Sequence, residues 1–596
     1  MKKFLSLVLA LVMTMSLVTV SAGAKDFSDD GSITYKEAVD VISGIGVVDG
    51  YSGGDFKPTD VLTRGAAAKI ICNLILGPTT ASALSASSAP FKDVPVSNTF
   101  AGYITYCAQE KIINGYPDGT FRPTATLSGN AFMKMLLGAL GYDSSVEGYT
   151  GPNWSVAVIK QAVGIGLDDG NDEFVGSKAV TRQEAALYAF NMLQSTMVEY
   201  DAKTTVDVNG ATVTIAGDKA KEVSNGAANE TIKDDNKMQF GEKYFDKLTL
   251  NDDGSDAFAR PSNVWRFKGE KVGTYAKTPD ATYSSNVELG DIYKDLELSE
   301  KDTADVYING LKGDDVVVSK ANEVKIASDS GNKDKVGTGS TVEVFYDEDH
   351  NDVTICVIDN YVGTVSKTVE AKGNADRYVV IANESDTSIA NYNNEYETEE
   401  TFADDAVVIF TYSASEKEIQ SVAVAESAAG TMTRKEDNKT TGKKVTLADT
   451  AYSVAKNVGY DGFTFDSMTV DSEYTAYLDQ YGNAIYFVEE EFVPEDYAMI
   501  TAIEGNRNDS NFDSNRVKLL TGAGEIKTYD TDKDYKNANG RFAQGDIVTY
   551  KVDADKDVKL SKTSTSGKTL GLGYFEDDGD FIMENGKAAI KVNGTK

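Results

Sequence analysis

The sequence is poor in cysteine, histidine and basic residues. Its 596 residues include three cysteines, one histidine and 58 lysines and arginines against 93 aspartates and glutamates, a formal net charge of −35. A surface of this sign repels a phosphate backbone, which excludes nucleic acid as a partner. Cys72, Cys107 and Cys356 form no CxxC motif and no Cys/His cluster, so we expect three unpaired thiols and neither a disulfide scaffold nor a zinc site.

The scarcity of histidine also argues against an enzyme. His350 stands alone, which excludes a His-dependent catalytic triad and a multi-histidine metal site. No phosphate-cradling glycine loop stands out, and nothing marks a pair of carboxylates as a general acid and base. We therefore expect no catalytic residues.

Proline is scarce after residue 200, where only three of the ten prolines lie. The charge is divided as well: residues 1–200 hold 14 basic and 19 acidic residues, a net charge of −5, and residues 201–596 hold 44 and 74, a net charge of −30. The 31 tyrosines and 24 phenylalanines indicate folded cores rather than a disordered acidic tail. This composition break predicts a domain boundary near residue 200.

Long apolar runs are absent except at the N-terminus. Lys2 and Lys3 precede the apolar run 4–20, which ends in small residues at 21–24, and this is the pattern of a secretory signal peptide. We expect residues 1–24 to be removed on export, which leaves no membrane partner after cleavage. An N-terminal membrane anchor is the alternative.

Between residues 25 and 198 one pattern occurs three times, over 25–77, 88–143 and 147–198. In each copy a glycine-rich turn precedes a phenylalanine, and a hydroxyl residue follows seven positions later. The hydroxyl residue is a good helix N-cap, because apolar residues at helical spacing follow it. Each copy predicts a helix, a turn and a second helix, and we expect the copies to pack into one all-α bundle. The pairs are Phe56 and Thr63, Phe121 and Ser128, and Phe174 and Thr181, where Glu184 adds a capping box.

These residues resemble the S-layer homology (SLH) domain. Its motifs are matched by Phe-Lys-Asp-Val at 91–94, Gly-Tyr-Pro-Asp-Gly-Thr-Phe-Arg-Pro at 115–123 and Thr-Arg-Gln-Glu-Ala at 181–185. The resemblance covers about residues 26–198. It implies a three-pronged helical bundle that binds an anionic, often pyruvylated, secondary cell-wall polysaccharide of Gram-positive bacteria.

The resemblance assigns the polysaccharide site to the helix starts and the turns. Arg64 and Arg182 are the binding arginines, since a guanidinium binds the carboxylate of a pyruvate ketal through two hydrogen bonds beside the N–H groups of a helix start. The second copy has Gly129 at this position, which leaves its groove in doubt. The alternative is that the arginines cover surface or pair with carboxylates, and Trp154 either stacks on a sugar or anchors a helix. The other candidates are Thr63, Thr181, Glu184, Tyr116, Asp118 and Gly119.

Residues 201–596 are predicted to be a tandem array of small all-β domains, because short alternating runs are separated by Asn, Asp and Gly clusters. Hairpins are predicted at 206–213, with an Asn-Gly turn, and at 341–357. The second hairpin recurs at intervals of 66, 66 and 73 residues. Its returning strands begin near Val353, Ile419, Ile485 and Val558, and its outgoing strands end at Tyr346, Tyr412, Leu478 and Lys551.

This periodicity sets the predicted boundaries. They are a β-rich connecting region at 199–270, β units at 271–361, 362–428, 429–495 and 496–563, and a partial or capping unit at 564–596. Such arrays resemble the bodies of clostridial-type SLH surface proteins. The last segment is either a reduced cap or the sign of a fragment.

Three acidic turns place oxygen ligands at alternate positions, as calcium loops do. None has the central glycine and closing glutamate of an EF-hand, so solvated turns that keep edge strands from pairing are the alternative. Calcium is left open, and no other cofactor is expected. The candidates are Asp347, Asp349 and Asn351, then Asp530, Asp532 and Asp534, then Asp553, Asp555 and Asp557.

The sequence therefore predicts a non-enzymatic cell-surface protein. The helical bundle would bind wall polysaccharide, and the acidic array would project outward as an S-layer or related envelope component that can assemble into a lattice. The alternative is a wall-anchored adhesin whose β units bind host or partner glycans or proteins.

Overall fold

The structure is a computed structural model of the chain. It describes residues 27–201, 204–208, 211–215, 219–226, 230–285, 287–298, 303–312, 316–317, 335–348, 352–372, 377–384, 389, 393–398, 400–438, 442–470, 472–489, 496–504, 516–521, 524–531, 545–552, 557–562, 573–575, 580–583 and 588–591. The predicted signal peptide, 1–24, lies outside the described residues. The chain divides into two compact units, Met1–Glu489 and Glu490–Lys596, and each is described by itself.

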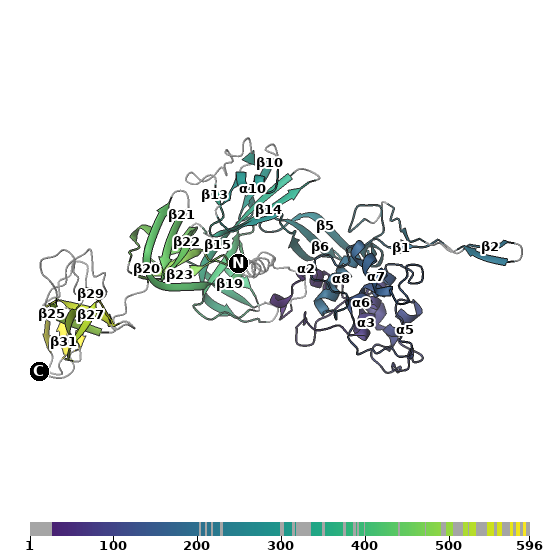
Figure 1. Cartoon of the computed structure of the whole chain (residues 1–596), viewed down its shortest axis with the longest axis horizontal. Helices are drawn as coiled ribbons and strands as arrows, with labels where there is room; N and C mark the ends of the chain where they lie inside the picture. The colour runs from purple at the N-terminus through teal and green to yellow at the C-terminus, as the bar shows by residue number, and fades with distance from the viewer. Residues whose placement is uncertain are drawn as a thin grey trace. The chain divides into compact units, whose positions relative to one another are not determined.

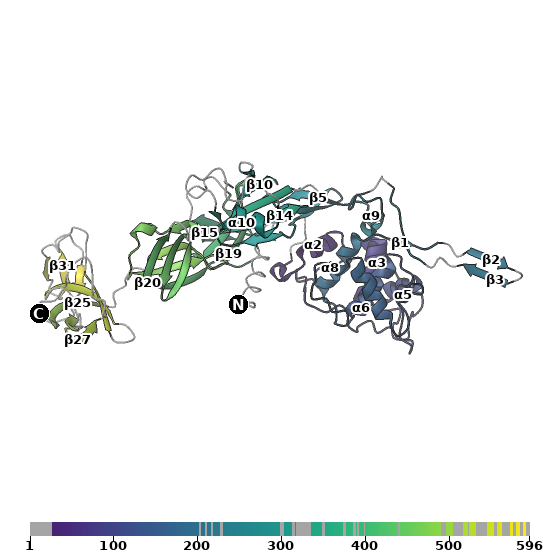
Figure 2. The ribbon, with the colours of Figure 1, turned by 45° about the horizontal axis from the view of Figure 1, so that its top comes forward.

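The N-terminal region is helical, and Figure 2 shows its helices gathered in one body. The second helix of each predicted pair begins after a capping hydroxyl, whose oxygen accepts a hydrogen bond from the backbone N–H three residues later. The helical elements are η1 (Asp30–Ser32), α2 (Lys36–Gly44), α3 (Arg64–Leu76), α4 (Pro78–Ser82), α5 (Ala101–Gln109), α6 (Gly129–Ala139), α7 (Trp154–Gly164) and α8 (Arg182–Leu193).

Backbone hydrogen bonds join the three capped segments in a ring. The N–H of Leu62 donates to the carbonyl of Val180 at 2.7 Å, that of Val180 to Leu127 at 2.9 Å, and that of Leu127 to Leu62 at 2.9 Å. The starts of α3, α6 and α8 therefore meet in a cyclic arrangement. The backbone N–H group of the first residue of each helix donates in the same cyclic order. That of Arg64 donates to the carbonyl of Ala125, that of Gly129 to the carbonyl of Lys178 and that of Arg182 to the carbonyl of Asp60.

The core of the helical body extends beyond residue 200. Phe240, Leu248, Trp265, Val272 and Tyr275 are buried in the same cluster as the helices. The boundary expected between 198 and 199 therefore falls inside one core, because charge counts describe the surface and do not register buried apolar side chains. The elements that follow α8 are β1 (Val198–Glu199), β2 (Thr204–Val208), β3 (Ala211–Ile215), β4 (Lys221–Glu222), α9 (Phe240–Tyr244), β5 (Leu248–Ser255), β6 (Pro261–Phe267) and β7 (Glu270–Ala276).

Polar contacts hold the antiparallel sheet of β5, β6 and β7 on helix α2. Nε1 of Trp265 donates to Oε1 of Glu37 at 2.7 Å, and the hydroxyl of Tyr275 donates to Oδ2 of Asp40 at 2.8 Å. Lys36 forms an ion pair with Asp40 at 2.8 Å. Burial raises the pKa of Asp40 to about 6, against the opposing effect of Lys36.

The rest of the first unit is rich in strands (Figure 1). Two of its cores, which lie within residues 287–357 and 361–422, are separate clusters. The elements are β8 (Ala281–Tyr283), β9 (Val287–Glu288), α10 (Leu289–Asp295), β10 (Thr303–Ile308), β11 (Leu311–Lys312), β12 (Val316–Val317), β13 (Lys335–Val336), β14 (Ser340–Asp347), β15 (Asp352–Val369), β16 (Tyr378–Asn383), β17 (Glu395–Glu397), β18 (Val407–Ser413) and β19 (Glu418–Val424).

One strand serves two of these cores. The first half of β15 pairs with β14 and, in parallel, with β10, and its second half pairs with β16 and β18. The boundary expected between 361 and 362 therefore falls inside a continuous strand. A long strand can continue from one set of partner strands to the next without a linker, because each half of it hydrogen-bonds to neighbours on both of its edges.

Two closed barrels share one strand order. In the first unit the order is β20-β21-β22-β24-β23 with β22 and β24 parallel, and in the second it is β25-β26-β27-β29-β28 with β27 and β29 parallel. This order is that of the five-stranded OB-fold. The strands are β20 (Glu426–Asn438), β21 (Gly442–Leu447), β22 (Thr450–Tyr460), β23 (Glu473–Leu478), β24 (Ala484–Glu489), β25 (Asp496–Glu504), β26 (Arg516–Thr521), β27 (Ile526–Thr531), β28 (Ile547–Val552) and β29 (Asp557–Lys562); η2 (Phe465–Ser467) precedes β23, and β30 (Gly573–Phe575), β31 (Asp580–Met583) and β32 (Ala588–Lys591) form a last sheet.

The predicted hairpins are confirmed. Tyr346 lies opposite Val353, Tyr412 opposite Ile419, and the two later hairpins are β23 with β24 and β28 with β29. Each returning strand begins within one residue of its predicted start. Strands β2 and β3 form the hairpin predicted at 206–213, and its Asn-Gly turn lies outside the described residues.

Candidate binding grooves at the helix starts

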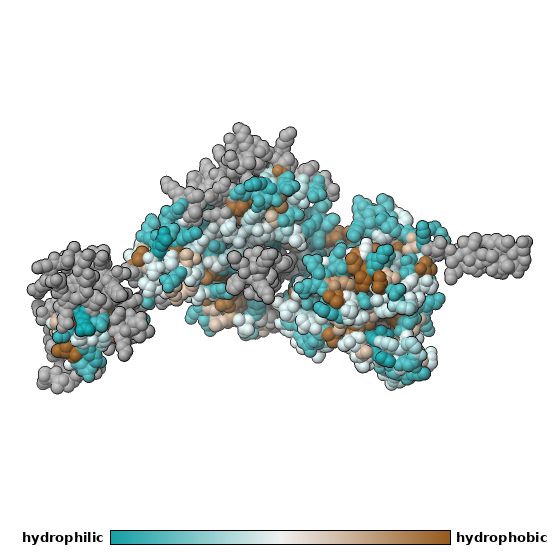
Figure 3. Space-filling model, viewed as in Figure 1, coloured by the Kyte–Doolittle hydropathy of each residue, from teal (hydrophilic) through white to brown (hydrophobic). Residues whose placement is uncertain are grey.

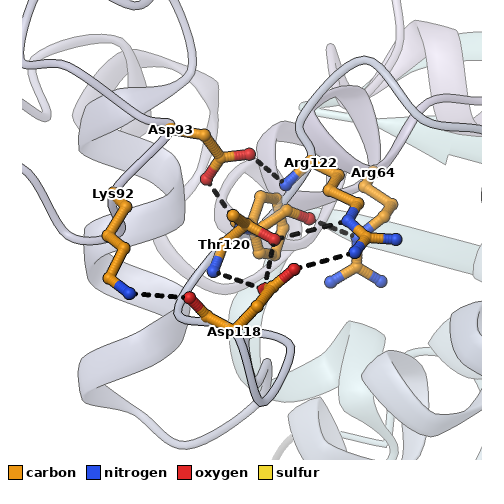
Figure 4. Close-up of polar contacts among 7 residues, drawn as sticks. Arg64, Lys92, Asp93, Asp118, Thr120 and Arg122 are labelled. Carbon is orange, nitrogen blue, oxygen red and sulfur yellow. Dashed lines mark hydrogen bonds and ion pairs between the residues drawn. The ribbon is translucent and has the colours of Figure 1, made fainter.

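The turn of the second segment is held by two aspartates (Figure 4). The carboxylate of Asp93 accepts hydrogen bonds from the backbone N–H groups of Phe121 and Arg122, both at 2.7 Å. Asp118 accepts from the N–H of Thr120 at 2.9 Å and from its hydroxyl at 2.6 Å, and pairs with Arg122 at 2.9 Å. These bonds, with that of Thr120 the largest cause, lower the pKa of Asp118 to about 2. The turn is thus fixed before any ligand arrives.

The turn of the first segment is built in the same way. The carboxylate of Asp29 accepts from the N–H groups of Phe56 and Lys57, both at 2.7 Å. Lys57 has a φ of 58° and Arg122, its counterpart, a φ of 59°. This is a left-handed backbone conformation that residues other than glycine adopt rarely. In both turns the basic side chain lies over a tyrosine ring, with Lys57 Nζ 4.5 Å from the centroid of Tyr51.

Arg64, at the first position of α3, reaches the turn of the second segment. Its Nε donates to the carbonyl of Phe121 at 2.8 Å and its Nη2 to that of Asn114 at 3.3 Å. The guanidinium carbon lies 4.4 Å from the ring centroid of Phe121 and 5.1 Å from that of Tyr116. Arg122 also lies 4.1 Å from the ring centroid of Tyr116, so two cations contact one tyrosine.

Arg182, at the first position of α8, makes the same contacts with the turn of the first segment. Its Nε donates to the carbonyl of Phe56 at 2.8 Å and its Nη2 to that of Asp49 at 2.9 Å. The guanidinium carbon lies 4.7 Å from the ring centroid of Tyr51. Each arginine therefore joins the start of one helix to the turn of a different segment, and we call each such set of an arginine with the tyrosine and basic residue of the turn a candidate groove.

The guanidinium groups keep their charge available. Both are half-buried, and burial lowers the pKa of each. Their hydrogen bonds go to backbone carbonyls, and within the described part of the chain neither arginine forms an ion pair. The alternative that these arginines pair with a carboxylate therefore has no support in the described contacts, and a bound anion would meet a cation without a direct counter-charge.

The third such position has no cation and no room for one. A Cβ atom at Gly129, the first residue of α6, would lie 2.9 Å from the ring of Phe174 and 3.1 Å from the Cα of Gly176. Real Cβ atoms essentially never show the first distance and rarely show the second, so a side chain at Gly129 would force Phe174 or the backbone at Gly176 to shift. The loss of arginine from the second copy thus accompanies a closer approach of the third segment.

The other predicted site residues have different positions. Thr63 and Thr181 use their hydroxyls as helix caps, and the carboxylate of Glu184 accepts from the N–H of Thr181 at 2.7 Å, so these three residues build the helix starts. Trp154 packs against the core in part, with Lys134 Nζ 5.4 Å from its ring. Gly119 has a φ of 81° in the turn that carries Tyr116 and Asp118.

The sequence interpretation missed Tyr51, Lys57 and Arg122. Spacing could have found them: Tyr51 and Tyr116 each lie five residues before the turn phenylalanine, and Lys57 and Arg122 follow it directly. Tyr51 and Tyr116 keep 45% and 38% of their surface exposed, which suits a platform for a sugar ring. The helical body also has hydrophobic patches on a mostly hydrophilic face (Figure 3).

The calcium candidates are only partly described. Asp347 ends β14 opposite Asp352, and Asp530 in β27 accepts from Nε of Arg516 at 2.8 Å. The described residues contain no group of three or more acidic, cysteine or histidine side chains able to hold a metal ion. Asp557 begins β29. The other candidates in these turns, Asp349, Asn351, Asp532, Asp534, Asp553 and Asp555, lie outside the described residues.

Comparison with known proteins agrees with this architecture. The profile of the S-layer homology domain matches residues 26–68 and 90–129, the first two segments. The chain is therefore an SLH-containing cell-surface protein of Gram-positive bacteria, anchored to the cell wall. No helix among the described residues is both long and apolar enough to cross a membrane.

Several surface proteins are similar to part of the chain. The "Surface layer protein" of Brevibacillus choshinensis is 28% identical over 150 residues, the "Middle cell wall protein" of Brevibacillus brevis 25% over 166, and the "Cellulosome-anchoring protein" of Acetivibrio thermocellus 42% over 83. The matches cover 25%, 27% and 14% of this chain and 13%, 15% and 18% of those proteins. The solved chain "drosophila Unr CSD456", 12% identical, covers 35% of this chain and 99% of its own length with a TM-score of 0.14.

Proposed function

We propose that this protein is an S-layer or related envelope protein whose three SLH repeats bind an anionic, pyruvylated secondary cell-wall polysaccharide. Two grooves carry the binding: one of Arg64, Tyr116 and Arg122, the other of Arg182, Tyr51 and Lys57. The observation that supports this most directly is that both arginines are fixed through Nε on a carbonyl and lie against a tyrosine, with no ion-pair partner among the residues that the structure describes.

The chemistry suits a ketal-linked pyruvate. Its carboxylate can accept two hydrogen bonds from a guanidinium. The second cation of each groove is already in an ion pair, Arg122 with Asp118 at 2.9 Å and Lys57 with Asp55 at 3.2 Å, so the main attraction comes from Arg64 and Arg182. The exposed tyrosine ring offers an apolar face to a sugar ring. Since Gly129 leaves the third groove without a cation, we propose that the first two grooves bind and that the third is structural.

A co-sedimentation assay tests this function. The mature chain is incubated with purified wall polymer, before and after chemical removal of pyruvate, and the pelleted fraction is measured. We expect the Arg64→Ala/Arg182→Ala double variant and the depyruvylated polymer each to lower retention at least tenfold. Lys69→Ala is the matched control, because Lys69 is an exposed lysine on the same helix as Arg64. Equal retention by the double variant and the control would contradict the mechanism.

We also propose that the β units project from the wall and assemble with other copies. The charge of −30 on residues 201–596 keeps this part soluble and leaves the near-neutral helical part to meet the anionic wall. Electron microscopy of the purified chain separates this from the adhesin alternative: ordered sheets support assembly, and capture of a glycan or protein by dispersed chains supports adhesion.

A further inference from the structure

Two of the three cysteines face each other inside the helical body. Cys72 on α3 and Cys107 on α5 are fully buried, and their Sγ atoms lie 3.6 Å apart. The contacts are reciprocal. The thiol of Cys72 lies 3.5 Å from the carbonyl of Tyr103, one turn before Cys107, and the thiol of Cys107 lies 3.6 Å from that of Ala68, one turn before Cys72. The two side chains therefore point at each other from the same level of two packed helices.

We propose that Cys72 and Cys107 are a disulfide site that crosslinks α3 to α5 when the exported chain folds in oxidising surroundings. A disulfide has a sulfur separation of about 2 Å, so the two Sγ atoms have to approach by roughly 1.5 Å. Export places the chain where disulfides persist. Cys356 lies on β15, outside the helical body, and serves as an internal comparison.

The reaction is thiol–disulfide exchange with a small-molecule disulfide as the oxidant. The thiolate of one cysteine attacks the small disulfide, forms a mixed disulfide and releases one small thiol. The thiolate of the second cysteine then attacks the protein sulfur of the mixed disulfide and releases the second small thiol. The cysteines lose two electrons and two protons in total, and the small disulfide becomes two thiols.

The timing follows from burial. The neighbouring cysteine and the lack of water raise the pKa of Cys72 far above its usual range, and a buried thiol reacts slowly because little thiolate is present. Exchange therefore belongs to the folding stage, before α3 and α5 close over the sulfur atoms. Afterwards the body shields either redox state from further exchange.

The crosslink would join the two sides of one groove. Helix α3 presents Arg64, and α5 precedes the turn that carries Tyr116 and Arg122. A bond between positions 72 and 107 restricts the unfolded chain over the intervening segment and so stabilises the folded body. Only this benefit to the groove rests on the proposed function, since the disulfide itself does not depend on it.

Refolding with glutathione tests the proposal. The mature chain is unfolded in guanidinium and refolded either in a reduced and oxidised glutathione mixture or with excess reductant, then digested without reduction and analysed by mass spectrometry. We expect a linked 72–107 peptide that lacks two hydrogen atoms, and a midpoint of thermal unfolding about 10 °C above that of the reduced chain. Cys356→Ala should keep the link, and Cys107→Ala should lose it.

The contrary result is equally clear. If Cys72 and Cys107 of the glutathione-refolded chain are alkylated as free thiols after denaturation, or carry glutathione instead of each other, the proposal fails. This measurement on the wild-type chain is sufficient by itself, so the proposal can still be tested if the Cys107→Ala variant does not fold. Binding to wall polymer is not measured, and failure of the proposed function would leave the result unchanged.

Discussion

At the residue scale, a few charged side chains shape the grooves through the backbone rather than through other side chains. Asp29 and Asp93 each accept two N–H groups of a turn, and Arg64 and Arg182 each donate to two carbonyls. Such charge-assisted bonds are short and strong. The position of each groove is therefore set by the main chain, and the charge of Arg64 and Arg182, which form no ion pair among the described residues, is left for a ligand.

We expect binding of the wall polymer to require the planar guanidinium of Arg64 and not only its positive charge. Arg64→Lys keeps the positive charge but loses the planar donor pair that lies between Phe121 and Tyr116, so we expect wall-polymer affinity to fall about tenfold, or roughly 1.5 kcal/mol. Isothermal titration calorimetry with the purified polymer measures the change. Affinity equal to that of wild type would mean that charge alone is sufficient.

The turn aspartate should contribute to stability. Asp93→Ala removes two charge-assisted hydrogen bonds and leaves the N–H groups of Phe121 and Arg122 without their acceptor, so we expect a loss of about 2 kcal/mol in the free energy of unfolding of the helical body. Urea unfolding followed by circular dichroism measures it. Asp172→Ala, at an exposed aspartate, is the control and should change stability by less than about 0.5 kcal/mol.

At the element scale, the helix starts differ although their caps are alike. Thr63, Ser128 and Thr181 cap α3, α6 and α8 in the same way. The residue after the cap differs, because it is arginine at 64 and 182 but glycine at 129, where a Cβ atom would already meet Phe174 and Gly176 of the third segment. The absence of the motif arginine at position 129 thus goes with tight packing of the third segment against that position.

Restoring the missing arginine should therefore not restore a groove. Gly129→Arg forces the new side chain against Phe174 and Gly176, so we expect a loss of about 1–3 kcal/mol in stability and no added polymer binding. Thermal unfolding and the stoichiometry of polymer binding measure the two effects. A stable variant with one more bound ligand per chain would contradict this interpretation.

The contact between α2 and β7 should depend on pH. The pKa of Asp40 is raised to about 6 from 3.8 because burial disfavours its charged form. A folded-state pKa above the unfolded value means that the stabilisation is complete below about pH 4 and is lost as the pH rises through 6. Urea midpoints at pH 4.5 and 7 should show lower stability at pH 7, and Asp40→Asn should reduce the difference; an unchanged difference would exclude this carboxyl as the cause.

At the scale of the whole molecule, the anchoring part is larger than its repeats. Trp265 and Tyr275 reach back over about 230 residues of sequence to α2, where Nδ2 of Asn263 also donates to Glu37 at 3.0 Å. A helical body without β5, β6 and β7 would expose the apolar side chains of this contact. Glu37 would also lose the hydrogen bonds that Asn263 and Trp265 donate to it.

Truncated chains test whether the folded helical body includes β5, β6 and β7. A fragment of residues 27–200 should unfold at a midpoint at least 5 °C below that of residues 27–276, because about 1–3 kcal/mol of stabilisation is lost with each large buried side chain that is removed. Differential scanning calorimetry of the two fragments measures the difference. Equal midpoints would restore the boundary near residue 200.

Elements that depend on neighbours in the chain could be predicted from the sequence. Caps, turns and hairpins use residues within a few positions, as Thr181 with Glu184 and the recurring hairpins show. Contacts between distant residues became visible only in the folded chain. Folding placed Arg64 and Arg182 on the turns of other segments, brought Cys72 to Cys107 and extended the core to Trp265, because contacts between distant positions arise from packing and leave no local pattern.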